Sequence, residues 1–242
     1  MSFLNLFHQK SKILTTVDIH SHLIPGIDDG AKNMERTIEL ILELKEMGYT
    51  KLITTPHISD MFLNDSQKII EGYNLVIQEL SHRNIDITIE VAAEYYINEH
   101  FMELLDKKDI LTFGKEKYLL FELSYFTPPR DLESLVYEIK QAGYTPVLAH
   151  PERYEYFHNS IEKYYKMKSF GLLFQINLTS IANYYSKNIK KCVKQLILHN
   201  LVDFVGTDTH HRGHIKYLKS TFSNLLYKQT FQKNKILNDT LV

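Results

Sequence analysis

The chain has 242 residues, 44% of them hydrophobic, which is enough for one sizeable core and within the range of a single-domain α/β barrel. Its formal net charge is −1 and it has no long basic stripe before its last residues, which argues against binding to nucleic acid. The single cysteine, Cys192, excludes an intramolecular disulfide framework and a cysteine-based zinc site.

The N-terminal residues 1–12 include the apolar Phe3, Leu4, Leu6 and Phe7 but no stretch long enough for a signal peptide. We expect this short segment to pack on the body of the protein or on a partner. No later window approaches a membrane span, so we expect a cytoplasmic protein without one. The sequence leaves the oligomeric state open.

Short β-rich runs alternate with helical patterns along the rest of the chain. This alternation is typical of βα units that build a parallel sheet. The predicted strands are residues 14–20, 51–57, 86–94, 118–124, 145–150, 172–177 and 202–208.

Four longer helical patterns lie between or after these strands. Asn33 and Asp131 are placed to cap the helices of 33–48 and 130–143, and Gly48 and Gly143 are placed to end them. The pattern of 66–83 is similar but contains Gly72, which lowers helix propensity. The pattern of 214–235 begins helical and ends polar and basic, so we expect its end to fray. Periodicity alone leaves open whether the sheet opens into a doubly wound fold or closes into a barrel.

The ends of the predicted strands favour a barrel-type active site. Six of the seven strands end on a side chain that can bind a metal, and the sixth strand in order ends on Asn177 instead. The carboxyl ends of parallel barrel strands open on one face, where catalytic residues from several strands meet. The strand-end ligand candidates are His20 with His22, His57, Glu94, Glu122, His150, and Asp208 with His210.

The types of side chain indicate which ions would bind. Residues i and i+2 of a strand point the same way, so His20 and His22 can bind one ion, and Asp208 and His210 repeat the spacing. Imidazole and carboxylate without thiolate suit manganese, iron or zinc. The converging carboxylates, including one of the neighbouring Asp28 and Asp29, would repel each other without cations. We therefore predict a site with more than one metal ion, and three ions would leave a positive surplus that suits a phosphate dianion.

Six segments give the chain a resemblance to the PHP (polymerase and histidinol phosphatase) superfamily. Within it, the chain resembles the bacterial capsule-type protein-tyrosine phosphatases of the CpsB/CapC/YwqE family. The matching segments span residues 18–212 in family order. They are DIHSHLIPGIDDG, TTPH, AAEYY, LFELS, AHPERY and GTDTHHR.

The resemblance implies that residues 1–242 form a single PHP-type metallophosphatase domain, a distorted (β/α)7 TIM-like barrel with a helical C-terminal segment at 214–242. It also implies three divalent ions, with manganese expected and iron or zinc as alternatives. The implied ligand sets are His20, His22, Glu94 and Asp208 for one ion, Glu94, Glu122 and His150 for the second, and Asp29, His57 and His210 for the third.

Two arginines, Arg153 and Arg212, closely follow ligand positions. By the same resemblance they bind the substrate's phosphate, for which the planar guanidinium is suited. A hydroxide generated by the metals would attack phosphorus. A cysteine nucleophile is not expected, because Leu198 stands where a phosphate loop starting at Cys192 would need arginine.

The resemblance therefore implies a protein-tyrosine phosphatase whose partner is a bacterial tyrosine kinase that controls capsular or exopolysaccharide synthesis. The alternative within the superfamily is a phosphoesterase acting on histidinol phosphate or another small phosphomonoester. An amidohydrolase-type enzyme, a nuclease and a metal-binding regulator without turnover remain further alternatives. Aromatic residues of the same loops, including Tyr96, Tyr125 and Phe126, could line a groove for a phosphotyrosine ring or simply pack.

Overall fold

The computed structural model describes residues 13–158 and 160–242, so the apolar segment 1–12 and the prediction made for it lie outside the described residues. The strands are β1 (Val17–Asp18), β2 (Lys51–Thr54), β3 (His57–Ile58), β4 (Thr88–Val91), β5 (Glu94–Tyr96), β6 (Tyr118–Glu122), β7 (Thr145–Ala149), β8 (Leu173–Asn177) and β9 (Phe204–Gly206).

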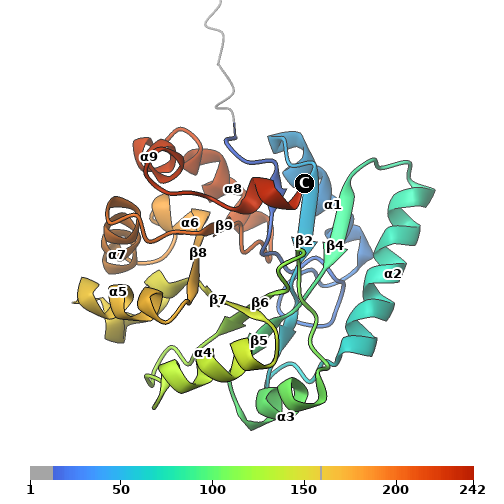
Figure 1. Cartoon of the computed structure of the whole chain (residues 1–242). Coiled ribbons are helices and arrows are strands. Elements are labelled where there is room, and N and C mark those ends of the chain that lie inside the picture. The colour runs from blue at the N-terminus through green and yellow to red at the C-terminus, as the bar shows by residue number, and fades with distance from the viewer. Residues whose placement is uncertain (1–12, 159) are drawn as a thin grey trace, which may run out of the picture.

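Helices cover the outside of these strands (Figure 1). The α-helices are α1 (Met34–Met47), α2 (Ser66–His82), α3 (Glu99–Lys107), α4 (Leu132–Gln141), α5 (Ile161–Ser169), α6 (Leu178–Ile181), α7 (Lys187–Leu198), α8 (Arg212–Thr221) and α9 (Leu225–Lys233). Short 3-10 helices are η1 (Pro151–Arg153), η2 (Glu155–Phe157) and η3 (Asn238–Leu241). Within the described ranges, no helix has the length and apolar character needed to cross a membrane.

All strand pairs are parallel and form two sheets, in the orders β1-β2-β4 and β3-β5-β6-β7-β8-β9. Every predicted strand is present, but 51–57 and 86–94 are each divided between the sheets. The first division falls at Pro56, which has no N–H for a ladder, while Thr55 N–H donates to Ser21 O at 2.7 Å. The two sheets do not form one continuous closed ladder. The structure therefore confirms an α/β fold with parallel strands and does not confirm a closed barrel.

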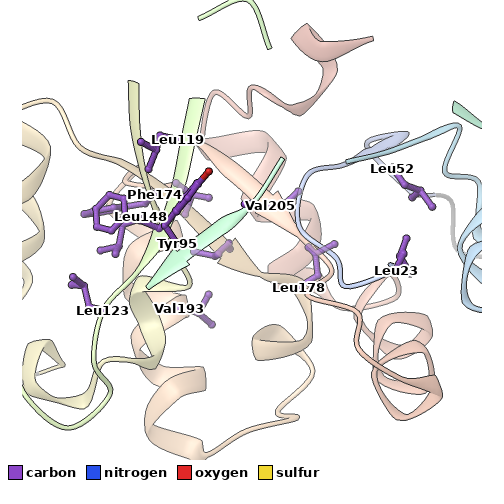
Figure 2. Packing of buried hydrophobic residues seen from close by; sticks show 14 of the residues in the cluster. Leu23, Leu52, Tyr95, Leu119, Leu123, Leu148, Phe174, Leu178, Val193 and Val205 are labelled. Carbon is purple, nitrogen blue, oxygen red and sulfur yellow. The ribbon is translucent and has the colours of Figure 1, made fainter. Parts of the chain in front are cut away.

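The two faces of the strands are buried in two different clusters. On β6, Leu119 and Phe121 belong to the larger cluster, which also contains the apolar faces of the helices. Tyr118 and Leu120 point the other way into a smaller cluster made mostly of strand residues. Figure 2 shows members of the larger cluster, among them Leu119, Leu148 and Phe174. Because both faces are covered, the strand sequences read as nearly continuous apolar runs.

The predicted helix ends are largely confirmed by their hydrogen bonds. The side chain of Asn33 accepts from Arg36 N–H at the start of α1, and Gly48 ends the helix with a φ of 115°. Asp131 caps α4 in the same way by accepting from Ser134 N–H. The expected fraying of the C-terminal segment is wrong, because α9 continues to Lys233 and η3 is packed against the strands.

Asn238 of η3 bridges the first and last strands. Its Nδ2 donates to Val17 O at 2.9 Å and to Val205 O at 2.8 Å, and its Oδ1 accepts from Val205 N–H at 3.0 Å. Leu241 completes the small inner cluster beside Phe204. At the opposite end of the same strands, Ser21 and Thr209 form an isolated parallel bridge. The C-terminal segment therefore links β1 to β9 through the hydrogen bonds of Asn238.

Candidate metal centre

The structure brings all nine predicted metal ligands together at the carboxyl ends of the strands. They form four overlapping groups, in each of which one potential ligand atom per residue lies within 4.8 Å of the others. The groups are His22, Asp29, His57 and His210; His20, His22 and Asp208; His20, Glu94 and His150; and His57, Glu94 and Glu122.

Strand geometry explains how the ligands reach one place. Glu122 follows Leu120 by two residues, so it lies on the same inner face of β6, next to the small apolar cluster. His150 and Asp208 stand just beyond β7 and β9, with φ angles of 35° and 50°. This left-handed backbone is costly for a residue with a side chain, and such strained residues tend to cluster at functional sites.

Glu94 occupies the centre of the cluster. Its Oε2 lies 3.1 Å from His20 Nε2 and 3.2 Å from His57 Nδ1. Its other oxygen, Oε1, lies 3.0 Å from His150 Nε2. Both oxygens of this carboxylate therefore face imidazoles of other ligand candidates.

The two neighbouring aspartates have different positions. Asp28 is buried, with its Oδ2 2.9 Å from His22 Nδ1 and within 3.2 Å of His57 N–H. The side chain of Asp29 is 57% exposed and faces the free edges of the His57 and His210 rings, at 3.6 and 3.3 Å from their Nε2 atoms. Asp28 therefore orients His22 from behind, and Asp29 faces the cluster, as the family spacing implied.

A glycine makes this turn possible. A Cβ on Gly30 would lie 2.3 Å from His22 O, so no other residue fits without a shift in the backbone. Ala31 N–H then donates to His22 O at 3.1 Å, which closes the loop against the strand end.

The ionisable side chains of the cluster shift one another's pKa values. Burial raises the pKa of Glu122 to about 8, and repulsion from Glu94 acts in the same direction. Although burial works against its ionisation, the charges of His20 and His57 hold the pKa of Glu94 well below its usual value. The pKa values of these two neighbouring carboxyls are therefore shifted in opposite directions, as expected for like charges held close together. Carboxylates and imidazoles without thiolate are a donor set for manganese, iron or zinc.

Arg153 lies beside the cluster and is held between two tyrosines. Its Cζ is 4.6 Å from the ring centroid of Tyr125 and 4.7 Å from that of Tyr185. Its Nη1 is 3.4 Å from Asp208 Oδ2, and its side chain remains 24% exposed. A stacked guanidinium with free N–H groups is prepared to bind an anion next to the metals.

Arg212 lies elsewhere. It is the first residue of α8, and its Nε donates to Glu43 of α1 at 2.7 Å, with its side chain 63% exposed. It does not line the cavity that contains the cluster. In this arrangement Arg212 pairs with Glu43 and does not face the ligand cluster.

The cluster forms the floor of an open cavity of about 560 Å³. Tyr96, Tyr125, Phe126 and Tyr184 are among the aromatic residues that line it. Phe126 is 94% exposed and Met61, on the loop after β3, is 84% exposed. Other aromatics of the same loops, such as Tyr154, are buried in the core and do not contribute to a groove.

Sequence reasoning missed several residues behind the ligands. His214 Nδ1 lies 2.7 Å from Asp208 O, and Tyr185 OH donates to Asp208 Oδ2 at 3.3 Å. Gln175 and Asn177 of β8 contact two of the predicted ligands directly. Two amides, Gln175 and Asn177, in a mostly apolar strand were the available signal for these residues.

Clustered carboxylates and histidines, an adjacent arginine and an open cavity at the carboxyl ends of parallel strands define a metal-dependent hydrolase class of site. The chain belongs to the family described as "Capsular polysaccharide synthesis, CpsB/CapC", whose profile matches residues 16–233.

Known relatives extend this likeness over most of the chain. The tyrosine-protein phosphatase CpsB of Streptococcus agalactiae is 31% identical over 201 residues, which are 81% of this chain and 83% of CpsB. The tyrosine-protein phosphatase YwqE of Bacillus subtilis is 30% identical over 196 residues, 81% of this chain and 77% of YwqE. A solved structure from work on YwqE and on CpsB of Streptococcus pneumoniae, described as unique metal-dependent tyrosine phosphatases, superimposes with a TM-score of 0.78 at 27% identity. It covers 89% of this chain and 91% of that one.

Proposed function

We propose that this chain is a metal-dependent protein-tyrosine phosphatase. The observation that carries the proposal is the convergence of nine ligand-type side chains, seven of which line one cavity together with Arg153. Family membership and the names of the relatives support the same activity. We assign the nine residues to three divalent ions, with manganese expected and iron or zinc as alternatives.

Each part of the cavity has a role in this proposal. Divalent ions at such a site supply a hydroxide nucleophile at neutral pH and Lewis acidity toward phosphoryl oxygens. Arg153 binds the non-bridging oxygens of the phosphate, and Tyr125 and Tyr185 keep its guanidinium in place. The leaving phenolate of a phosphotyrosine has a pKa of about 10, so it departs more easily than an alkoxide and needs less help from a general acid.

The rim of the cavity supports a protein substrate. A small phosphomonoester would contact the ligand cluster and would leave the side chains of Phe126 and Met61 exposed to solvent. Side chains this exposed and apolar are better explained by contact with a peptide around the phosphotyrosine. We propose a bacterial tyrosine kinase of capsular or exopolysaccharide synthesis as the phosphorylated partner, acted on in the cytoplasm.

The proposal includes the overall architecture. We propose that the two sheets together make a distorted (β/α)7 barrel within a single domain. The bridge between Ser21 and Thr209 and the contacts of Asn238 support this closure between β1 and β9.

The experiment is a comparison of three substrates. The protein is stripped with chelator, reloaded with Mn²⁺ or Zn²⁺, and assayed for phosphate release from a phosphotyrosine peptide, a phosphoserine peptide and histidinol phosphate. Metal-dependent release from the phosphotyrosine peptide, with little from the others, is the expected result. Preference for histidinol phosphate would keep the metal centre and replace the substrate.

Three variants separate metal chemistry from thiol chemistry. His20→Ala and Glu94→Ala should abolish turnover, because each removes a ligand shared by two groups of the cluster. Cys192→Ser should keep it, because Cys192 is buried between Tyr164 and the core, away from the cavity. Full activity of either ligand variant would refute the proposal.

A further inference from the structure

β8 is the strand that ends without a metal ligand, yet it carries two polar side chains. Gln175 and Asn177 are two residues apart, so they point to the same side of the strand. Both are completely buried. Buried amides are costly unless all their polar atoms are bonded, so their partners indicate what they do.

The two amides connect ligand candidates from opposite ends of the chain. Gln175 Oε1 lies 2.7 Å from His20 Nδ1, and Gln175 Nε2 donates to Asn177 Oδ1 at 3.0 Å. Asn177 Nδ2 then donates to Asp208 Oδ2 at 2.6 Å. The result is one continuous line of hydrogen bonds from His20, after β1, to Asp208, after β9.

The chemistry of Asp208 sets the direction of every bond in this line. An ionised carboxylate can only accept, so Asn177 must present its NH₂ group to Asp208. The carbonyl oxygen of Asn177 therefore faces Gln175, which must present its own NH₂ group. The carbonyl oxygen of Gln175 then faces His20, whose Nδ1 must carry the proton. In the neutral ring, which is the form that binds a metal, the Nε2 atom that faces the cluster is then the nitrogen without a proton.

The same line selects which oxygen of Asp208 faces the metals. Asn177, Tyr185 and Arg153 all approach Oδ2. Oδ1 instead lies 3.5 Å from the Nε2 atoms of both His20 and His22. We propose that Gln175 and Asn177 are positioning residues that fix the His20 tautomer and the Asp208 rotamer as one unit and so prepare the metal centre.

The surrounding backbone is shaped to hold this pair of amides. A Cβ on Gly206 would lie 2.7 Å from both Gln175 Nε2 and the Cβ of His20, so glycine gives the amide its place beside the imidazole. The buried carboxylate of Glu152 accepts from Asn177 N–H and from Ser180 Oγ, both at 2.8 Å. These contacts fix the junction of β8 and α6, from which Asn177 projects.

The test measures metal binding directly, so it rests on the metal centre of the proposed function and not on its substrate. Gln175→Met and Asn177→Leu keep the size of each side chain and remove its hydrogen bonds. We expect each to lower the affinity for Mn²⁺, measured by calorimetric titration of the stripped protein, by about 10- to 100-fold, as is usual for groups behind metal ligands. If Asn177→Leu does not fold, Asn177→Ser, too short to join both neighbours, replaces it.

A double variant shows whether the two amides act together. If they form one line, breaking it twice should cost little more than breaking it once, so the combined loss should be well below the product of the two single losses. Fully multiplicative losses would mean that the amides act separately and would overturn the proposal.

Asn234→Leu is the matched control. Asn234 is also a buried amide, and it bonds to Val202 N–H and to backbone carbonyls far from the cluster. The Asn234→Leu variant should have a lower melting temperature and an unchanged affinity for Mn²⁺. The positioning role would be refuted if this control lost as much affinity for Mn²⁺ as the β8 variants. It would also be refuted if the single β8 variants bound Mn²⁺ within about threefold of the wild type, against the expected loss of about 10- to 100-fold. A wild type that binds no divalent ion would refute the metal centre as well, whereas binding without phosphatase activity would refute the substrate alone.

Discussion

Replacing Arg153 by lysine tests the phosphate-binding role with the charge retained. The change removes the planar fork and the stacking on Tyr125 and Tyr185. Loss of one charge-assisted hydrogen bond costs about 2 kcal/mol and loss of the ring contacts about 1 kcal/mol. Their sum of about 3 kcal/mol corresponds to a fall in kcat/KM of about 150-fold, since 1.36 kcal/mol is a factor of ten.

The assay is turnover of a phosphotyrosine peptide at saturating Mn²⁺, with the affinity for Mn²⁺ measured in parallel because Arg153 also contacts Asp208. Arg83→Lys, at a surface ion pair with Glu35, is the matched control and should have full activity. Arg212→Lys should lose much less than Arg153→Lys, because Arg212 is paired with Glu43 outside the cavity. These bond energies predict a decrease in kcat/KM of about 150-fold for Arg153→Lys. A decrease of less than about threefold would refute the reasoning.

Four further outcomes are expected. Burial raises the pKa of Cys192 to about 12, so iodoacetamide at pH 8 should neither label the native thiol nor reduce activity, as mass spectrometry can check. Asp28→Ala should weaken Mn²⁺ binding about tenfold, because His22 loses the acceptor on its Nδ1. Asn238→Ala should lower the free energy of unfolding in urea by about 3 kcal/mol, at roughly 1 kcal/mol for each of three buried hydrogen bonds. Chelation should lower the melting temperature, and Mn²⁺ at 100 times its Kd should restore about 2.7 kcal/mol of stability.

Local patterns were sufficient to predict where the strands lie and which ligand-type side chains come together. Six of the seven predicted strands carry a ligand candidate at or just beyond the carboxyl end, so the placement of Glu94, Glu122 and His150 already implied convergence. The choice between Asp28 and Asp29 could not be made from composition, because it depends on how the Gly30 turn rotates each carboxylate.

Features that depend on distant partners escaped prediction. The expected fraying after residue 214 ignored the backbone groups of β1 and β9, which only the fold places within reach of Asn238. Arg212 follows His210 by two residues, but the start of α8 turns it toward Glu43. The divisions of 51–57 and 86–94 likewise follow from a change of pairing partner, which periodicity does not record.

The junction of β1 and β9, which Asn238 bridges, has a consequence for how the molecule folds. Asn238 Nδ2 and Val17 O are 221 residues apart in sequence, and Thr207 N–H and Asp18 are 189 apart. Contacts this distant are entropically expensive to form and are made late. A nascent chain therefore carries an unpaired β1 edge until synthesis has passed Asn238. During that interval it is open to aggregation or to pairing with another chain. His20 and His22, just after β1, become neighbours of Asp208, just after β9, only when this edge closes, so assembly of the ligand cluster depends on that closure.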